Sequence, residues 1–265
     1  MGILQNSNAI GAAGSTDFYD HPIDQSIRID PANSSHLKLN ASDASNNRRY
    51  WTLSTWVKKT GLDTSGSSAL NTFYTAGNEG LTNSSGTSDT ILGLGFYQNH
   101  IYLNSQTTNM VNQTTVERRD SSGWMHVVIS ANNGAGLIYI DGTQTVSFNY
   151  DGGADTAWNG TSYYQYIGTR RVGTSDYYFD GYIAEMMMIS HSTNAAVLTP
   201  TSFGEYKAGN IWVPKDISGL SNQDFYLKFE NASDIGNDSS GNNRDFTAVN
   251  MGADHVVKDS PNFSS

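Results

Sequence analysis

The chain has 265 residues, of which charged side chains make up only 15%, with 25 acidic residues against 15 basic ones. The net charge of −10 argues against partners with a phosphate backbone or an anionic membrane surface, because these attract clustered lysine and arginine. The sequence contains no cysteine, so disulfide bonds and thiolate metal sites are excluded and packing must hold the fold.

Residues 1–20 are small, polar and without hydrophobic periodicity. They have neither the basic start nor the apolar centre of a signal peptide, and no part of the chain reaches the roughly 18 apolar residues of a membrane helix. We expect 1–20 to be either a frayed terminus or a flexible docking arm that orders against a partner, and we retain the docking arm. The expectation for the rest is a single domain over 21–265, made in a cytoplasm without a signal peptide or membrane insertion.

Alternation of apolar and polar residues predicts strands through the first part of the chain, at 26–30, 36–40, 50–57, 91–97 and 100–104. In the strand over 50–57, Trp51, Leu53 and Val57 share one face, whereas Trp56 points to the other. Such one-sided patterns are typical of sheets that cover a core.

The middle of the chain carries the clearest local signals. Residues 124–130 are apolar on both faces, which predicts a central strand in a covered sheet. The pair Asp141-Gly142 separates two alternating runs, 137–140 and 143–146. This pattern predicts a two-residue hairpin turn, because both turn positions require positive φ.

Further strands are expected at 163–168 and 178–189. One short helix is predicted, with Thr199 as its cap, Pro200 at its first position and about two turns over 201–206. No segment keeps a 3.6-residue apolar period, so short strands separated by turns favour an all-β sandwich or barrel.

Four segments resemble the concanavalin A-like lectin/glucanase superfamily in its laminin G-like branch, in the family's order: 51–57, 123–129, 138–142 and 178–185. The resemblance implies an all-β, concanavalin A-like jelly-roll sandwich of two antiparallel sheets with one short helix. In many laminin G-like domains an Asp-Ser-Ser-Gly-Asn turn precedes the first of these strands, whereas here it lies at 238–242. We therefore expect residues 225–250 to return beside the N-terminal strands, as a circular permutation would place them.

Further segments are similar to lectin-like proteins encoded by tailed bacteriophages: 17–26, 198–206, 212–215, 225–229, 238–243 and 259–261. This resemblance implies a non-catalytic structural protein on the surface of a virion, with other virion proteins and host surface glycans as partners. Two roles remain open: host attachment on a tail fibre or baseplate, and capsid decoration or cementing through protein contacts alone. Both roles predict a homo-oligomer, for which we expect a trimer.

The sequence does not show a catalytic constellation. Glycoside hydrolases use two carboxylates that flank the scissile bond, but Asp180 and Glu185 have an odd spacing that puts them on opposite faces of a regular strand. A glycan-degrading enzyme therefore remains a remote alternative. We expect no cofactor. Several loop residues have side-chain oxygens that either bind calcium or only stabilise turns, and we favour the turn role. These residues are Asp151, Asp155, Asp234, Asp238 and Asn242.

Candidate ligand-binding residues lie in and after the long loop that precedes the strand over 163–168. Aromatic faces stack on sugar rings and arginine donates to hydroxyl groups, although the same residue types dominate protein interfaces. The candidates are Trp158, Tyr163, Tyr164, Arg170, Arg171 and Tyr177.

Overall fold

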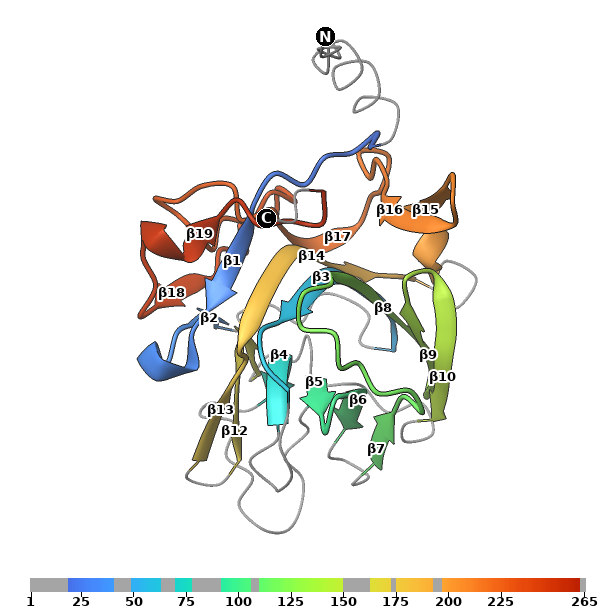
Figure 1. Ribbon diagram of the computed structural model, residues 1–265, viewed down its shortest axis with the longest axis horizontal. Helices are drawn as coiled ribbons and strands as arrows, with labels where there is room; N and C mark the ends of the chain where they lie inside the picture. Colours follow the sequence, from blue (N-terminus) through green and yellow to red (C-terminus); the bar gives the residue numbers. More distant parts are fainter. Residues whose placement is uncertain are drawn as a thin grey trace, which may run out of the picture.

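The alternating runs of the sequence form strands that pair into two large antiparallel sheets (Figure 1). The structure is a computed structural model, and it describes residues 19–40, 49–62, 70–77, 92–105, 110–149, 163–172, 175–192 and 197–262. Within these residues the protein is a jelly-roll β-sandwich, which confirms the expected fold class.

The first sheet has eight strands in its described part. In spatial order these are β10 (Thr143–Asn149), β9 (Ala135–Ile140), β8 (Met125–Asn132), β3 (Tyr50–Lys59), β14 (Gly181–Ser190), β1 (Ser26–Ile29) and β19 (Val256–Val257), with β17 (Gln223–Leu227) also on β14. Strand β8, which is buried from Met125 to Ala131, is interior to the sheet, as its two apolar faces predict.

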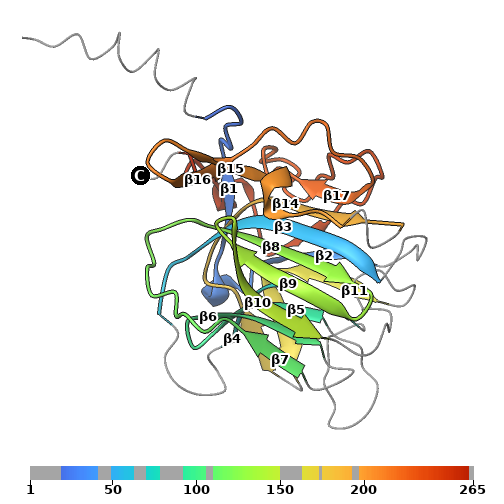
Figure 2. The same cartoon turned by 90° about the vertical axis from the view of Figure 1, so that its right-hand side faces the viewer.

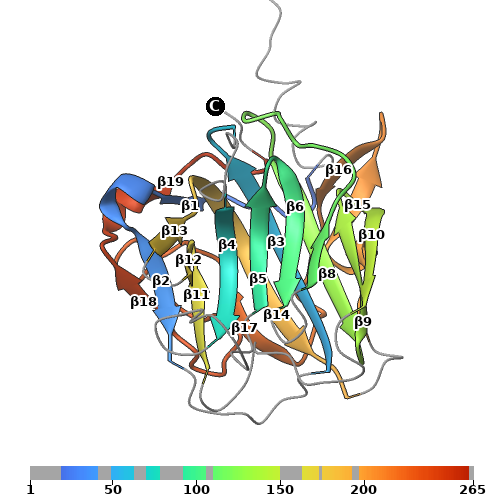
Figure 3. The ribbon, with the colours of Figure 1, turned by 90° about the horizontal axis from the view of Figure 1, so that it is seen from below.

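The second sheet has seven strands in its described part, and Figure 3 shows β4, β5 and β6 in front of β3 and β14. Their order is β18 (Thr247–Val249), β2 (His36–Leu39), β11 (Tyr164–Ile167), β4 (Leu70–Gly77), β5 (Leu92–Tyr97), β6 (His100–Ser105) and β7 (Met110–Gln113). Two separate ribbons complete the strands, β12 (Thr169–Val172) with β13 (Ser175–Tyr178), and β15 (Gly204–Lys207) with β16 (Ile211–Pro214).

The main hydrophobic core lies between the two sheets. Trp51, Leu53 and Val57 of β3 point into it and are fully buried. Trp56 points to the opposite side and packs in a separate cluster with Ile23. The period-two pattern of this strand therefore sorts its side chains between two apolar environments, as predicted.

The Asp141-Gly142 turn is confirmed. Ile140 and Thr143 are paired across it, and Asp141 and Gly142 have φ values of 49° and 78°. Both values lie in the left-handed region that two-residue hairpins with these residues use.

The predicted helix over 199–206 is wrong in extent. Helical backbone is confined to one 3₁₀ turn, η6 (Pro200–Ser202), and Thr199 at its N-terminal cap makes no side-chain capping bond. The residues after it become β15, which pairs with β16 and brings Trp212 against His126 of the first sheet. Trp212 is partly buried there, in the cluster of Trp56 and Ile23. Tertiary packing thus overrides the local helix signal. Two further 3₁₀ turns are η1 (Pro31–Asn33) and η7 (Ala253–His255).

The C-terminal part of the chain lies beside the N-terminal strands (Figure 1). β18 pairs with β2, with Thr247 opposite Lys38, and β19 pairs with β1. Residues 1–18, the greater part of the expected docking arm, lie outside the described residues. Among the residues that the structure describes, no helix is long and apolar enough to cross a membrane.

Candidate functional site

A break in the strand pairing of β14 creates the candidate site. β1 pairs with residues 181–183 of β14, and β17 pairs with residues 186–189. Glu185 lies between these two partners, where the ladder to β3 is also irregular. A β-bulge of this kind re-aims a side chain, and bulges are frequent beside functional sites.

Glu185 has a left-handed backbone conformation, with φ of 46°. This conformation costs a residue other than glycine roughly 1–2 kcal/mol. It persists where the surrounding structure holds the residue in place, and such residues cluster at ligand-binding positions. Glu185 is therefore a reason to look closely at its surroundings.

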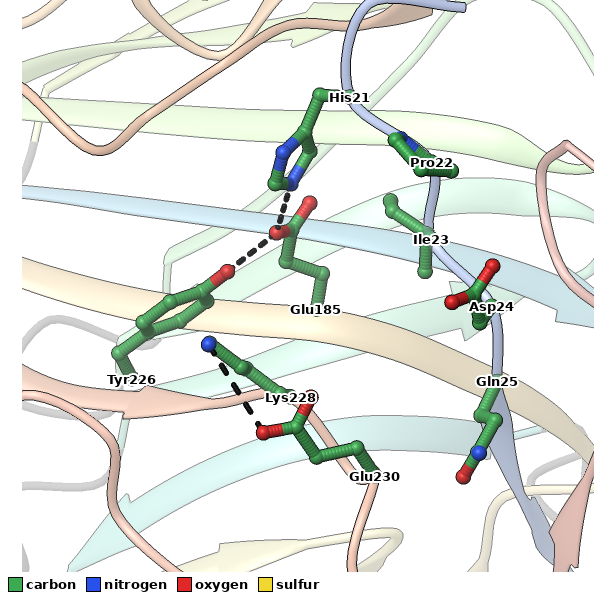
Figure 4. Close-up of a pocket in the computed structure, with 9 residues that line it drawn as sticks. All are labelled: His21, Pro22, Ile23, Asp24, Gln25, Glu185, Tyr226, Lys228 and Glu230. Atoms are coloured by element: carbon green, nitrogen blue, oxygen red, sulfur yellow. Dashed lines mark hydrogen bonds and ion pairs between the residues drawn. The ribbon is translucent and has the colours of Figure 1, made fainter.

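Two side chains from distant parts of the sequence bind the Glu185 carboxylate (Figure 4). His21 Nε2 lies 2.7 Å from Oε1, and the Tyr226 hydroxyl donates to the same oxygen at 2.5 Å. Glu185 is 8% exposed. The three residues come from the segment before β1, from β14 and from β17, so the cluster forms only when the sheet is assembled.

A cavity of about 170 Å³ opens beside this cluster. Its wall combines aromatic rings, a proline, acidic groups and one lysine. The lining residues are His21, Pro22, Ile23, Asp24, Gln25, Glu185, Tyr226, Lys228 and Glu230. We refer to this cavity as the Glu185 pocket. Asp24 and Glu230 are exposed, so its rim faces solvent.

The Glu185 carboxylate shifts the pKa values of the two side chains that bind it. The hydrogen bond to Glu185 raises the pKa of His21 above its ordinary value, against the opposing effect of burial. Burial, reinforced by the charge of Glu185, raises the pKa of Tyr226 strongly. Tyr226 thus stays protonated and donates to Glu185, and it is not available as a phenolate nucleophile.

The segment before β1 is held at both ends. Lys207 of β15 lies 2.7 Å from the Asp20 carboxylate, and the Ile23 amide donates to Asn262 Oδ1 at 2.6 Å. Trp212 of the same hairpin donates to His126 Nδ1 at 3.0 Å, which fixes the hairpin on the outer side of the sheet (Figure 2). These contacts keep His21 over Glu185 and shape one wall of the pocket.

The structure does not bring the two acids of the sequence analysis together. Asp180 accepts from Arg28 at 2.7 Å and from the Thr60 hydroxyl at 2.6 Å, whereas Glu185 faces its own pocket. The bulge makes the odd-spacing argument inapplicable, since it interrupts the regular alternation of β14. Asp180 and Glu185 therefore do not form the carboxylate pair of a glycosidase, because each has its own separate partners.

The predicted ligand-binding residues lie elsewhere, on and near the outer face of the seven-stranded sheet. Tyr164 is half-buried under Lys38, whose Nζ is 4.6 Å from its ring centre, and Tyr163 packs against the main core. Arg170 is buried, and it is the backbone partner of half-buried Tyr177 in the β12–β13 ribbon. The structure thus pairs Arg170 with Tyr177 in one ribbon, whereas Tyr164 belongs to β11 of the seven-stranded sheet.

Two of the predicted ligand-binding residues cannot be located in this way. Trp158 and the side chain of Arg171 lie outside the described residues. The same holds for the calcium candidates Asp151 and Asp155.

Asp238 acts as a turn-forming residue. Its carboxylate accepts the backbone N–H groups of Tyr226, Ser240 and Arg244, at 2.8–3.0 Å. Asn242, in the same turn, donates to the Gln223 carbonyl at 2.5 Å. The described residues contain no group of three or more His, Asp or Glu side chains that could hold a metal ion.

Sequence reasoning missed His21 and Tyr226 and gave Glu185 no binding role. The one available signal was a glutamate inside an otherwise apolar strand, next to Met186. Burial of a carboxylate requires hydrogen-bond donors, but the sequence does not show which donors the fold supplies.

Comparison with known proteins supports the fold. A family model described as the concanavalin A-like lectin/glucanases superfamily matches residues 31–198. This range includes Glu185 but neither His21 nor Tyr226. No curated protein sequence matches the chain.

Among solved structures, the chain is similar to a putative carbohydrate binding protein from Bacteroides ovatus, with 15% sequence identity and a TM-score of 0.57. That match covers 86% of this chain and 58% of the other, so this chain spans little more than half the length of that protein. A heptameric SAP-like pentraxin from Limulus polyphemus matches at 12% identity and a TM-score of 0.46, covering 76% of this chain and all of the other. The Ruminococcus gnavus IT-sialidase CBM40, bound to α2,3-sialyllactose, matches at 14% and 0.48, covering 68% of this chain and 96% of the other.

Proposed function

Because the chain belongs to the concanavalin A-like lectin/glucanases superfamily, we propose that it is a non-catalytic, lectin-like module that binds a sugar unit of a glycan in the Glu185 pocket. The observation that carries this proposal is the pocket itself, in which a buried, hydrogen-bonded carboxylate lies beside aromatic and apolar surface. Sugar sites combine these features, because ring faces pack on apolar groups while hydroxyls need fixed polar partners.

The size of the pocket limits what it holds. Its volume of about 170 Å³ is below the roughly 300–1,000 Å³ of pockets that enclose drug-sized ligands. It accommodates one sugar ring, with the remainder of the glycan outside. Asp24 and Glu230 on the rim supply further acceptors, and Lys228, 3.8 Å from Glu230, supplies donors. Affinity at such a site is modest, and several copies on one particle would raise it through avidity.

Binding without catalysis follows from the chemistry of the pocket residues. Tyr226 is held in its protonated form, and one oxygen of Glu185 already accepts two hydrogen bonds. Asp180 is engaged by Arg28 and takes no part. Hydrolysis with general acid catalysis requires two carboxylates at a defined separation across the scissile bond. The other two carboxylates of the pocket, Asp24 and Glu230, lie exposed on its rim, and we assign them to sugar binding.

A glycan array followed by calorimetry tests the proposal. The Glu185→Gln variant keeps the size of the side chain but removes the charged acceptor, and it is expected to lower affinity for any glycan bound by the wild type by about 10-fold or more, since hydrogen bonds to charged groups contribute about 1.5–3 kcal/mol. Glu117→Gln is the matched control, because Glu117 is a surface carboxylate paired with Arg119. Unchanged affinity in Glu185→Gln would rule out this pocket as the binding site. Release of reducing ends from a bound polysaccharide, lost in Glu185→Gln, would instead establish an enzyme.

The proposal includes a setting, the surface of a bacteriophage particle, where the module attaches the particle to host glycans. The similarity of segments such as 17–26 and 212–215 to phage-encoded lectin-like proteins supports this setting.

Capsid decoration through protein contacts is the second candidate, favoured by two exposed apolar side chains on the β15–β16 hairpin, Tyr206 and Ile211. Gold-labelled antibody on purified particles separates the two: label on the tail favours attachment, label over the head favours decoration, and absence of label removes the virion setting. Light scattering tests the expected trimer.

A further inference from the structure

Arg170 is a buried cation with too few partners. Its side chain is 4% exposed. Within the described residues it makes one hydrogen bond, a long one of 3.4 Å from Nη1 to the Tyr102 hydroxyl, and its Nε has no acceptor. None of the ion pairs in this part of the chain involves it.

Other buried or half-buried cations of the protein have close hydrogen-bonding or ion-pair partners. Lys58 is paired with Asp259, Lys59 donates to Asn99 Oδ1 at 2.5 Å, and Arg28 lies 2.7 Å from Asp180. Arginine cannot escape the cost of burial by losing its proton, since its pKa is too high. A buried guanidinium without a carboxylate is therefore an arrangement that an added anion would stabilise.

Buried groups of the seven-stranded sheet surround Arg170. The guanidinium lies over Gly93 of β5, where an added Cβ would already be 3.6 Å from Nη1. On its other side is Tyr102, whose hydroxyl is bonded to the Thr72 hydroxyl at 2.7 Å. Tyr97, half-exposed, packs edge-on against Tyr102 with ring centres 6.4 Å apart. The site thus joins a cation and hydroxyl groups to an aromatic surface.

From this geometry we propose that Arg170 is the centre of a second binding site, on the outer face of the seven-stranded sheet, that takes the carboxylate of an acidic sugar. The planar guanidinium matches a carboxylate through two parallel N–H···O bonds. The Tyr102 and Thr72 hydroxyls and the Tyr97 ring suit the sugar that carries it. This site is separate from the Glu185 pocket and does not depend on it.

Access to Arg170 requires movement of the ribbon that carries it. β12 and β13 form a two-stranded sheet of their own. Gly168, at the start of the ribbon, donates to the Phe73 carbonyl and accepts from the Phe179 amide. The Thr75 hydroxyl of β4 donates to the Thr169 carbonyl of the ribbon at 3.0 Å. The ribbon also packs against β4, so entry of a ligand requires the ribbon to separate from that strand.

Calorimetric titration with D-glucuronate tests the site, with D-glucose and acetate as companion ligands at matched ionic strength. We expect saturable binding of glucuronate to the wild type, at least 10-fold weaker binding by Arg170→Met, and binding by Arg170→Lys between the two, because lysine keeps the charge without the fork. Arg119→Met is the matched control, since Arg119 is an exposed surface arginine. The ligand-free Arg170→Met variant is expected to melt no lower than the wild type, because an unpaired buried charge has been removed.

Several results would overturn the proposal. Equal glucuronate binding by the wild type and Arg170→Met, or no binding by the wild type, removes the site. Equal binding of acetate and glucuronate, or of glucose and glucuronate, removes the acidic-sugar specificity. Glucuronate binding that falls in Glu185→Gln and not in Arg170→Met assigns the ligand to the other pocket. If Arg170→Met does not fold, comparison of Arg170→Lys with the wild type decides, since unchanged affinity there contradicts two-point recognition.

Discussion

Acidification should destabilise the protein through His126. The imidazole is 1% exposed and lies between two indoles, with its ring centre 4.7 Å from that of Trp56 and 6.0 Å from that of Trp212. Trp212 can only donate, so Nδ1 of His126 accepts from it and the ring proton is on Nε2, toward the Ser54 hydroxyl at 2.8 Å. Protonation would place a second donor against the Trp212 N–H in a buried site.

The magnitude follows from the difference in pKa between the two states. Burial lowers the pKa of His126 from 6.5 to about 3 in the folded protein. Between these values the unfolded chain binds a proton that the folded protein does not, so the stability provided by neutral His126 is present above pH 6.5 and is lost as the pH falls. At about 1.36 kcal/mol per pH unit, the loss is roughly 2 kcal/mol at pH 5 and roughly 4 kcal/mol at pH 3.

The assay is urea unfolding followed by tryptophan fluorescence at pH 7 and pH 5, for the wild type and for His126→Asn. Asparagine cannot titrate, and its Oδ1 replaces Nδ1 as the acceptor for Trp212. The free energy of unfolding should fall by about 2 kcal/mol more in the wild type than in the variant. Burial also lowers the pKa of His191, and the bond to Glu185 raises the pKa of His21. Both effects are common to the two proteins and cancel, so equal pH dependence would show that His126 is not desolvated in this way.

Two further predictions concern stability. Gly136→Ala should lower the free energy of unfolding by about 1–3 kcal/mol through overpacking, because an added Cβ would lie 2.1 Å from the Phe148 ring; Gly219→Ala, with open space around it, should change it by less than about 0.5 kcal/mol, and equal effects in urea unfolding would contradict the packing. Asp238→Ala should lower the free energy of unfolding by about 2 kcal/mol or more, since buried donors without an acceptor are destabilising. It should also speed hydrogen exchange at the Tyr226 amide, which donates to Asp238. Unchanged exchange at that amide would contradict the turn assignment.

The parts of the fold that were predictable from sequence are those set by neighbouring residues. The Asp141-Gly142 turn depends on the backbone freedom of two residues, and the two-faced strand β3 depends on a simple alternation. The prediction of a two-turn helix after Thr199 was wrong although its capping and proline signals were present. Those signals set only its first turn, while pairing of β15 with β16 and burial of Trp212 decided what followed.

The Glu185 pocket was not predictable because it depends on which segments share one edge of β14. The sequence shows Glu185 inside an apolar run but does not show that β1 ends and β17 begins opposite it. His21 is 164 residues away from Glu185, and Tyr226 is 41 residues away. No periodicity connects such positions, and the bulge that turns the carboxylate toward them lies where the pairing of β14 changes from β1 to β17.

This origin also limits what family membership implies about the pocket. The family match covers residues 31–198 and contributes Glu185. His21 comes from the segment before β1, Tyr226 from β17, and Lys228 directly follows β17. A carboxylate at the bulge without these flanking residues would lack both of its hydrogen-bond partners. The binding proposed for the pocket is therefore a property of the flanking segments acting on a family strand, and it must be tested with all of them present. Arg170, in contrast, lies within the matched range, so its site does not require the flanking segments for its ligand contacts.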